Sequence, residues 1–267
     1  MPILFDKVTA DSFEMNYFRF GSGQKTLVIL PGLSIQSVMG SAQAVADEYA
    51  VMKDDFTVYL FDRRAELPPR YRICDMARDT AKAIETLGLR DIYLFGASQG
   101  GMIAMQIAIE HPALVRKLAL GSTAADASAA DTGVLQKWID LALAKDRVNL
   151  YLAFGRVIYP SGVFAQYRDA LAAAGQSVTD QELARFVTLA RGTEGFNVTA
   201  KLSGIACPVL VLGAADDAVL GAQSTWQIVR ELGDRADFRY YIYDGYGHAA
   251  FDTAPDYRQR LYRFFMQ

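Results

Sequence analysis

The stretch Gly96-Ala97-Ser98-Gln99-Gly100-Gly101 is central to the fold of this chain. It follows an apolar run of β type at residues 92–95 and opens an apolar helical run at residues 102–108. Ser98 is therefore expected where a strand turns sharply into a helix, with glycines on both sides that let other backbone approach closely. This setting is typical of a nucleophile elbow, although the bare G-x-S-x-G pattern also occurs in turns without chemistry. Ser98 is thus a candidate nucleophile that needs support from elsewhere in the chain.

Length and composition indicate a globular α/β protein. The chain has 267 residues, of which 52% are hydrophobic and 21% charged, enough for one large domain with an insertion. A net charge of −3 without basic runs argues against nucleic-acid partners. No apolar stretch has the length of a signal peptide or membrane span, which predicts a cytoplasmic protein without membrane contact. Cys74 and Cys207 lack metal-ligand spacing and are expected to be free thiols, and no metal or other cofactor is expected.

Strand-like and helical runs alternate along most of the chain. Gly21-Ser22-Gly23 predicts a hairpin-type turn between the first two strand-like runs. Strand-type runs lie at residues 13–20, 26–30, 56–61, 92–95, 118–121, 208–213 and 238–243. The alternation predicts a mostly parallel eight-stranded sheet with helices on both faces. Residues 122–204 have no strand pattern and are predicted to form a helical insertion before the last two strands, which leaves residues 1–121 and 205–267 as the core.

Residues with the chemistry of acyl transfer follow four of these strands. In a parallel sheet the loops after the strands meet at one edge, so Leu33, Ser98, Asp216 and His248 are expected to lie together. A serine nucleophile needs an imidazole to take its proton. Of the two histidines, His111 closes the helix that Ser98 opens, which puts it about 18 Å away at the opposite edge of the sheet. His248 is therefore the candidate base.

The carboxylate that would orient this imidazole has two adjacent candidates. Asp216 and Asp217 follow Gly213-Ala214-Ala215, and they cannot both point toward the histidine; Asp216 is favoured, and Asp126 after another strand is a third candidate. The backbone N–H of Gln99 at the helix start, with that of Leu33 after Pro31-Gly32, would form an oxyanion hole.

With these residues in place, the chain resembles the α/β-hydrolase superfamily, in particular its lidded esterase, acyl hydrolase and C–C hydrolase branch. The resemblance rests on Pro31-Gly32-Leu33, the elbow at residues 96–101, Gly213-Ala214-Ala215-Asp216 and Gly247-His248. It implies that Ser98 is the nucleophile, Asp216 the acid and His248 the base, and that residues 122–204 are a cap over the pocket. Pro31 replaces the usual histidine, and residues 62–65 lack the glycine of the family's Asp-x-Arg-Gly turn.

The expected function is hydrolysis of a carboxylic ester or related acyl bond of a small-molecule substrate through an acyl-enzyme, with water as the second nucleophile. Hydrolysis of a C–C bond, amide or lactone, and acyl transfer, are alternatives on the same triad; a non-catalytic binding protein is the alternative from another class. Aromatic residues of the helical insertion are candidates for the substrate pocket: Trp138, Tyr151, Phe154 and Tyr159. Arg63, Arg64 and Arg156 would be the candidates if a substrate carboxylate has to be bound, although the default expectation for each is an ordinary surface or ion-paired arginine.

Overall fold

The computed structural model describes residues 2–128 and 133–267. The strands of these residues form one eight-stranded sheet in the order β1-β2-β4-β3-β5-β6-β7-β8. Strands β3 to β8 are parallel to their neighbours, and β1 and β2 add an antiparallel edge. The strands are β1 (Leu4–Ala10), β2 (Phe13–Phe20), β3 (Lys25–Leu30), β4 (Phe56–Arg64), β5 (Ile92–Ala97), β6 (Val115–Gly121), β7 (Val209–Ala214) and β8 (Phe238–Tyr243).

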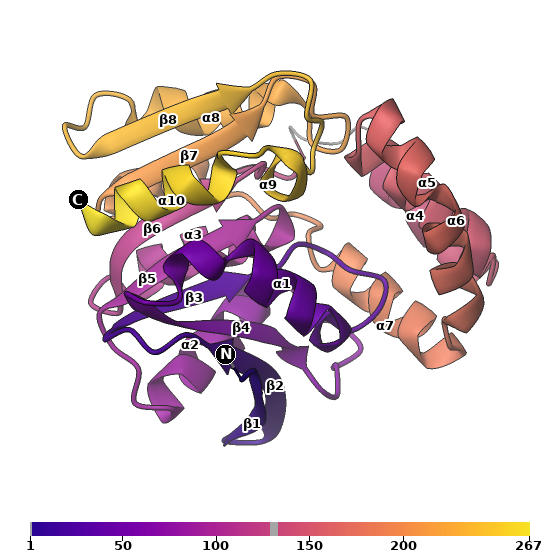
Figure 1. Ribbon diagram of the computed structural model, residues 1–267, viewed down its shortest axis with the longest axis horizontal. Helices are drawn as coiled ribbons and strands as arrows, with labels where there is room; N and C mark the ends of the chain where they lie inside the picture. Colours follow the sequence, from indigo (N-terminus) through magenta and orange to yellow (C-terminus); the bar gives the residue numbers. More distant parts are fainter. Residues whose placement is uncertain (1, 129–132) are drawn as a thin grey trace.

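Helices cover both faces of this sheet, which confirms the predicted fold class. Helices α2, α3 and α8 pack on one face, and α1, α9 and α10 on the other, each with its own apolar core (Figure 1). The helices outside the insertion are α1 (Ala42–Glu48), α2 (Ile73–Thr86), α3 (Gln99–Glu110), α8 (Ala222–Leu232), α9 (Ala250–Thr253) and α10 (Tyr257–Met266). Short 3₁₀ helices lie at Val38–Ser41, Ala50–Met52 and Thr199–Gly204.

Between β6 and β7 the chain forms four successive helices: α4 (Val134–Leu143), α5 (Arg147–Ile158), α6 (Ser161–Ser177) and α7 (Asp180–Arg191). Helix α4 packs against α5 and α7, and α5 packs against α6. These helices bury a third apolar core, which includes Trp138 and Phe186. In Figure 1, α4, α5 and α6 are grouped beyond the edge of the sheet.

Two sequence-based expectations at the antiparallel edge are corrected. The predicted hairpin through residues 21–23 is wrong, because β2 pairs with β1 and β4, and β3 lies on the far side of β4. Gly21 and Gly23 instead let the chain cross the start of β4: a methyl group on Gly23 would lie 1.8 Å from the Asp55 carbonyl carbon. Strand β1 was not predicted, because its first four residues are exposed and show no alternation.

The described residues contain no helix long and apolar enough to cross a membrane. Cys74 and Cys207 are both free.

Candidate active site

Ser98 lies in the turn between β5 and α3 with φ 52° and ψ −122°. Residues other than glycine rarely adopt such a positive φ, so the backbone here is strained. Two hydrogen bonds hold it in place: the Ser98 N–H donates to the Gly121 carbonyl at 2.8 Å, and the Thr123 hydroxyl donates to the Ser98 carbonyl at 2.7 Å. The side chain is half-buried and lines a cavity of about 600 Å³. The elbow therefore presents a hydroxyl to this cavity.

The glycines beside Ser98 are required by close backbone contacts. A methyl group on Gly96 would lie 2.3 Å from the Gly100 carbonyl oxygen, and one on Gly100 would lie 2.0 Å from the Leu30 carbonyl oxygen. Both distances are far shorter than any carbon–oxygen contact, and the atoms met are backbone that cannot move aside. Glycine at these positions is therefore what allows β5 to turn into α3 next to the end of β3.

His248 lies in the loop between β8 and α9 and is 3% exposed. Its Nδ1 is 2.9 Å from both carboxylate oxygens of Asp217, which lies after β7 and is also buried. Asp217 Oδ1 further accepts the N–H groups of Val219 at 2.8 Å and Leu220 at 3.0 Å. A carboxylate at Nδ1 holds the imidazole proton on that atom, which leaves Nε2 free to accept a proton.

The environment of Asp217 keeps it ionised. Burial alone would raise the pKa of its carboxyl group, but the nearby His248 ring and the two N–H donors outweigh burial and hold this pKa below its ordinary value. A neutral carboxylic acid would not stabilise a positively charged imidazole. The pair therefore has the charge that a general base and its orienting acid require.

The structure corrects the favoured choice of acid, because Asp217 rather than Asp216 contacts His248. Asp216 is exposed, and its Oδ2 accepts the Gly247 N–H at 3.0 Å. The Ala215 N–H still donates to the Tyr243 carbonyl at 2.7 Å, so pairing with β8 continues one residue beyond β7 and the turn starts later than expected. Asp216 thus fixes the loop that carries the histidine, and Asp217 contacts the ring.

The remaining acid and histidine candidates, Asp126 and His111, have other partners. Asp126 accepts from the side chain of Asn197 at 2.7 Å and from the Ser128 N–H at 2.9 Å. His111 follows the last residue of α3, and its Nδ1 is 3.7 Å from a Glu85 carboxylate oxygen. Helix α3 begins beside Ser98, so His111 lies at its opposite end, as the sequence predicts.

Ser98 and His248 line the same cavity, and among the described residues no hydrogen bond joins their side chains. Such contacts in substrate-free enzymes often form only when a substrate is bound. The cavity walls come from the end of β3, from α1 and from the insertion, and they are mostly apolar, including Ile29, Val45, Leu60, Phe95, Trp138, Phe154, Ile158, Leu171 and Val219. Glu48 and Arg258, whose charged groups are 3.2 Å apart, line another part of it.

Three of the four predicted pocket residues, Trp138, Phe154 and Tyr159, line this cavity. The rings of Trp138 and Phe154 are in contact, with centroids 4.4 Å apart. The fourth, Tyr151, is not among the lining residues, and its hydroxyl donates to the Gln36 side chain at 2.7 Å. Helical periodicity alone could not tell which aromatic side chains face inward.

Two backbone N–H groups near the elbow have no acceptor among the described residues. Among the hydrogen bonds of the described residues, neither the Leu33 N–H nor the Gln99 N–H donates to another protein atom. Gln99 is the first residue of α3, where free N–H groups and the helix dipole favour negative charge. Gly32 lies against Ser98: a methyl group on Gly32 would be 3.2 Å from Ser98 Cβ. The two turns that carry these N–H groups therefore adjoin the hydroxyl.

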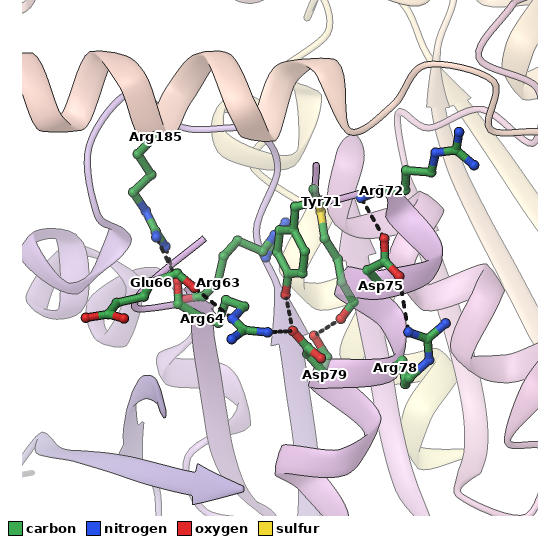
Figure 2. A network of polar contacts seen from close by, with 11 residues as sticks. Arg63, Arg64, Glu66, Tyr71, Arg72, Asp75, Arg78, Asp79 and Arg185 are labelled. Carbon is green, nitrogen blue, oxygen red and sulfur yellow. Dashed lines mark hydrogen bonds and ion pairs between the residues drawn. The ribbon is translucent and has the colours of Figure 1, made fainter. Parts of the chain in front are cut away.

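None of the three arginines suspected of binding a substrate carboxylate is among the described residues that line the cavity. Arg63 is buried, and Arg64 lies 3.3 Å from Asp79, which also accepts the Tyr71 hydroxyl at 2.8 Å. Figure 2 shows this network at the end of β4. Arg156 lies over the Phe164 ring, 5.4 Å from its centroid. Within the described residues no group of three potential metal-ligating side chains occurs.

Comparison with known proteins points to one family. A family model described as alpha/beta hydrolase fold matches residues 25–255. A protein of Caulobacter vibrioides named "Putative carbamate hydrolase RutD" is 26% identical over 86% of this chain and 87% of its own length. A similarly named protein of Agrobacterium fabrum is 24% identical over 88% of this chain and 93% of its own.

Solved structures show the same fold at low sequence identity. MGS-M2, an alpha/beta hydrolase enzyme from a Medee basin deep-sea metagenome library, has a TM-score of 0.86 at 17% identity and covers 98% of each chain. The enol-lactonase of Burkholderia xenovorans LB400 has a TM-score of 0.82 at 18% identity, over 98% of this chain and 100% of its own.

Proposed function

Since this chain belongs to the alpha/beta hydrolase fold family and is therefore a hydrolase, we propose that it cleaves carboxylic esters or related acyl bonds through a Ser98–His248–Asp217 triad. One observation carries the proposal. Ser98, on a strained elbow, lines the same cavity as the buried His248. The Nδ1 of this histidine is hydrogen-bonded to the ionised, buried Asp217. These are the nucleophile, base and orienting acid of acyl transfer.

In the proposed reaction the Ser98 hydroxyl attacks the substrate carbonyl carbon while His248 Nε2 takes its proton. The Asp217 carboxylate stabilises the resulting imidazolium. The carbonyl oxygen becomes an oxyanion, which the N–H groups of Leu33 and Gln99 bind. His248 then gives the proton to the leaving alcohol, and water attacks the acyl-enzyme by the same route in reverse.

The helical insertion, residues 122–204, serves as a cap over this site in the proposal. Its support is that Trp138 of α4, Phe154 of α5 and Leu171 of α6 line the same cavity as Ser98. The lining is largely apolar, and this favours neutral acyl groups of short to medium length. The cap would then determine which substrates fit the cavity, and the triad would determine the reaction.

Hydrolysis of graded p-nitrophenyl acyl esters, from acetate to decanoate, tests this function. The wild-type protein should turn over several of these esters, and Ser98→Ala should lose that turnover with an unchanged circular dichroism spectrum. A wild-type protein that hydrolyses none of them, or that hydrolyses them equally well without the Ser98 hydroxyl, would contradict the proposal. C–C, amide or lactone hydrolysis and acyl transfer use the same triad, and they would appear as activity on those substrates with the same dependence on Ser98.

Carbamate hydrolysis is the second candidate, because several relatives that match most of this chain are named as carbamate hydrolases. The same serine would attack the carbamate carbonyl. Turnover of p-nitrophenyl carbamate well beyond one equivalent per chain would favour this substrate over esters. A burst of one equivalent that then stops would favour the ester.

A further inference from the structure

Arg63, at the end of β4, connects the two turns that would bind the oxyanion. Its side chain is enclosed, with the residue 4% exposed. One guanidinium nitrogen, Nη2, donates to the Pro31 carbonyl at 2.7 Å and to Gln99 Oε1 at 3.5 Å. Pro31 begins the turn that carries the Leu33 N–H, and Gln99 carries the other N–H group. The two hydrogens of a single nitrogen therefore join both turns.

Keeping a cation at this place is costly. In the described part of the chain no ion pair joins the Arg63 guanidinium to a carboxylate, and its buried Nε has no hydrogen-bond partner. Burial lowers the pKa of Arg63 to about 10, so the group is still charged at neutral pH. An apolar side chain of similar length would fill this space without the desolvation penalty of a buried charge. Core packing alone therefore does not account for an arginine here.

Helix α7 supports the same arrangement from the other side. The Gln99 Nε2 donates to the Leu189 carbonyl at 2.8 Å, and Arg185 donates to the Arg63 carbonyl at 3.0 Å. Figure 2 shows Arg185 reaching from its helix to the end of β4, near Arg63 and Arg64. Residues of β4, α3 and α7 thus fix the backbone on which the two free N–H groups depend.

We propose that Arg63 is a positioning residue for the oxyanion hole, which sets the distance between the Leu33 and Gln99 N–H groups. The inference rests on the proposed function. Both donors must lie about 2.7–3.1 Å from the oxyanion at the same time, and a displacement of about 1 Å is enough to lower the rate of reaction strongly. Because the oxyanion exists only after attack, Arg63 should affect kcat far more than KM.

The test compares Arg63→Met with Arg64→Met, two neighbouring arginines of which only the first contacts the oxyanion turns. We expect Arg63→Met to lower kcat for p-nitrophenyl butyrate by about 10²–10³, the range found when one oxyanion donor is removed, with KM within about threefold. Arg64→Met should stay within about threefold of wild type in both. Arg63→Lys, which keeps a cationic donor, should regain at least about tenfold of the lost kcat. The variants should rank in the same order by the rate at which a fluorophosphonate labels Ser98, because the phosphoryl oxygen of this probe binds in the same oxyanion hole.

Thermal melting of each variant shows whether a loss of rate is a loss of fold. If Arg63→Met does not fold, Gln99→Met is the deciding variant. It removes the side-chain bond to Arg63 but keeps the backbone N–H at position 99, and we expect it to lower kcat about tenfold. A folded Arg63→Met with kcat within threefold of wild type, or an equal loss in Arg64→Met, would overturn the inference and leave the proposed function intact. A wild-type protein without hydrolysis and without labelling would defeat the proposed function, and this inference with it.

Discussion

The two ends of the candidate site are built in different ways. At the β7–β8 end, Asp217 and His248 come from loops after neighbouring strands, and their side chains contact each other directly. At the β3–β4 end the groups proposed to bind the oxyanion are backbone N–H groups. The side chains that hold the two turns, Arg63 and Gln99, are not among the described residues that line the cavity. In the proposed mechanism the first end would transfer protons, and the second would stabilise the negative charge of the oxyanion.

This difference predicts how each end responds to substitution. Removing a side chain at the β7–β8 end removes a chemical group, so the loss should be near complete. Removing a side chain at the β3–β4 end leaves both N–H donors in the chain and only changes their positions, so the loss should be partial.

The largest effect is expected at the nucleophile and base. Ser98→Ala and His248→Ala should each lower kcat/KM by about 10⁴ or more, and the double variant should lose little beyond either single one, because the residues act as a unit. His111→Ala is the matched control, since it removes the other histidine of the chain, and it should stay within about twofold. Additive losses in the double variant, or a severe effect of His111→Ala, would break this assignment. Ester hydrolysis by the wild type and the four purified variants gives the answer.

The next effect separates the two adjacent aspartates. Asp217→Asn should lower kcat by about 10⁴, the size of the loss when the orienting carboxylate of the best-studied triad becomes an amide. Asp216→Asn should cost less than about tenfold, because its side chain bonds the Gly247 N–H and not the imidazole. Steady-state kinetics on one ester measure both. A larger loss of kcat in Asp216→Asn than in Asp217→Asn would identify Asp216 as the acid of the triad.

A smaller effect concerns stability against acid. Asp217 has a folded-state pKa below the ordinary value of 3.8, so it stabilises the folded state above that pH, and this contribution is lost as the pH falls through the folded-state pKa. The free energy of unfolding of the wild type should therefore exceed that of Asp217→Asn by more at pH 6 than at pH 3. Urea titrations at both values test it. A difference that stays constant or grows at pH 3 would show that the carboxylate is not held in its charged form.

The smallest effect lies in the insertion. Phe154→Ala enlarges the cavity and should shift the preferred acyl chain of the ester by one or two methylenes, each worth about 0.8 kcal/mol, with little change in the maximal rate. Tyr151→Phe changes a residue of the same helix that does not line the cavity, and it should leave the preference unchanged. Rates on the graded ester series compare the two. A shift with Tyr151→Phe but not with Phe154→Ala would place the acyl group elsewhere.

The contrast between the two ends also explains what the sequence could predict. Strands β2 to β8, both layers of helices, the helices between β6 and β7 and the strand-to-helix turn at Ser98 follow from periodicity and glycine spacing, which are local properties. The exposed strand β1 has no such pattern. The choice between Asp216 and Asp217 depends on where strand pairing ends, and the sequence does not show that pairing continues to Ala215. The proposed role of Arg63 cannot be predicted from the sequence, since a backbone N–H exists at almost every residue and this arginine is one of 27 basic residues. Only the three-dimensional contact with Pro31 distinguishes it.

Fluorophosphonate labelling followed by peptide mapping tests the central claim most directly, because the probe reacts with a serine only when a base and an oxyanion hole activate it. The account predicts one label per chain, on the peptide that contains Ser98, absent in Ser98→Ala and strongly slowed in Asp217→Asn. A label on another residue, or no label on a folded wild-type protein, would contradict it.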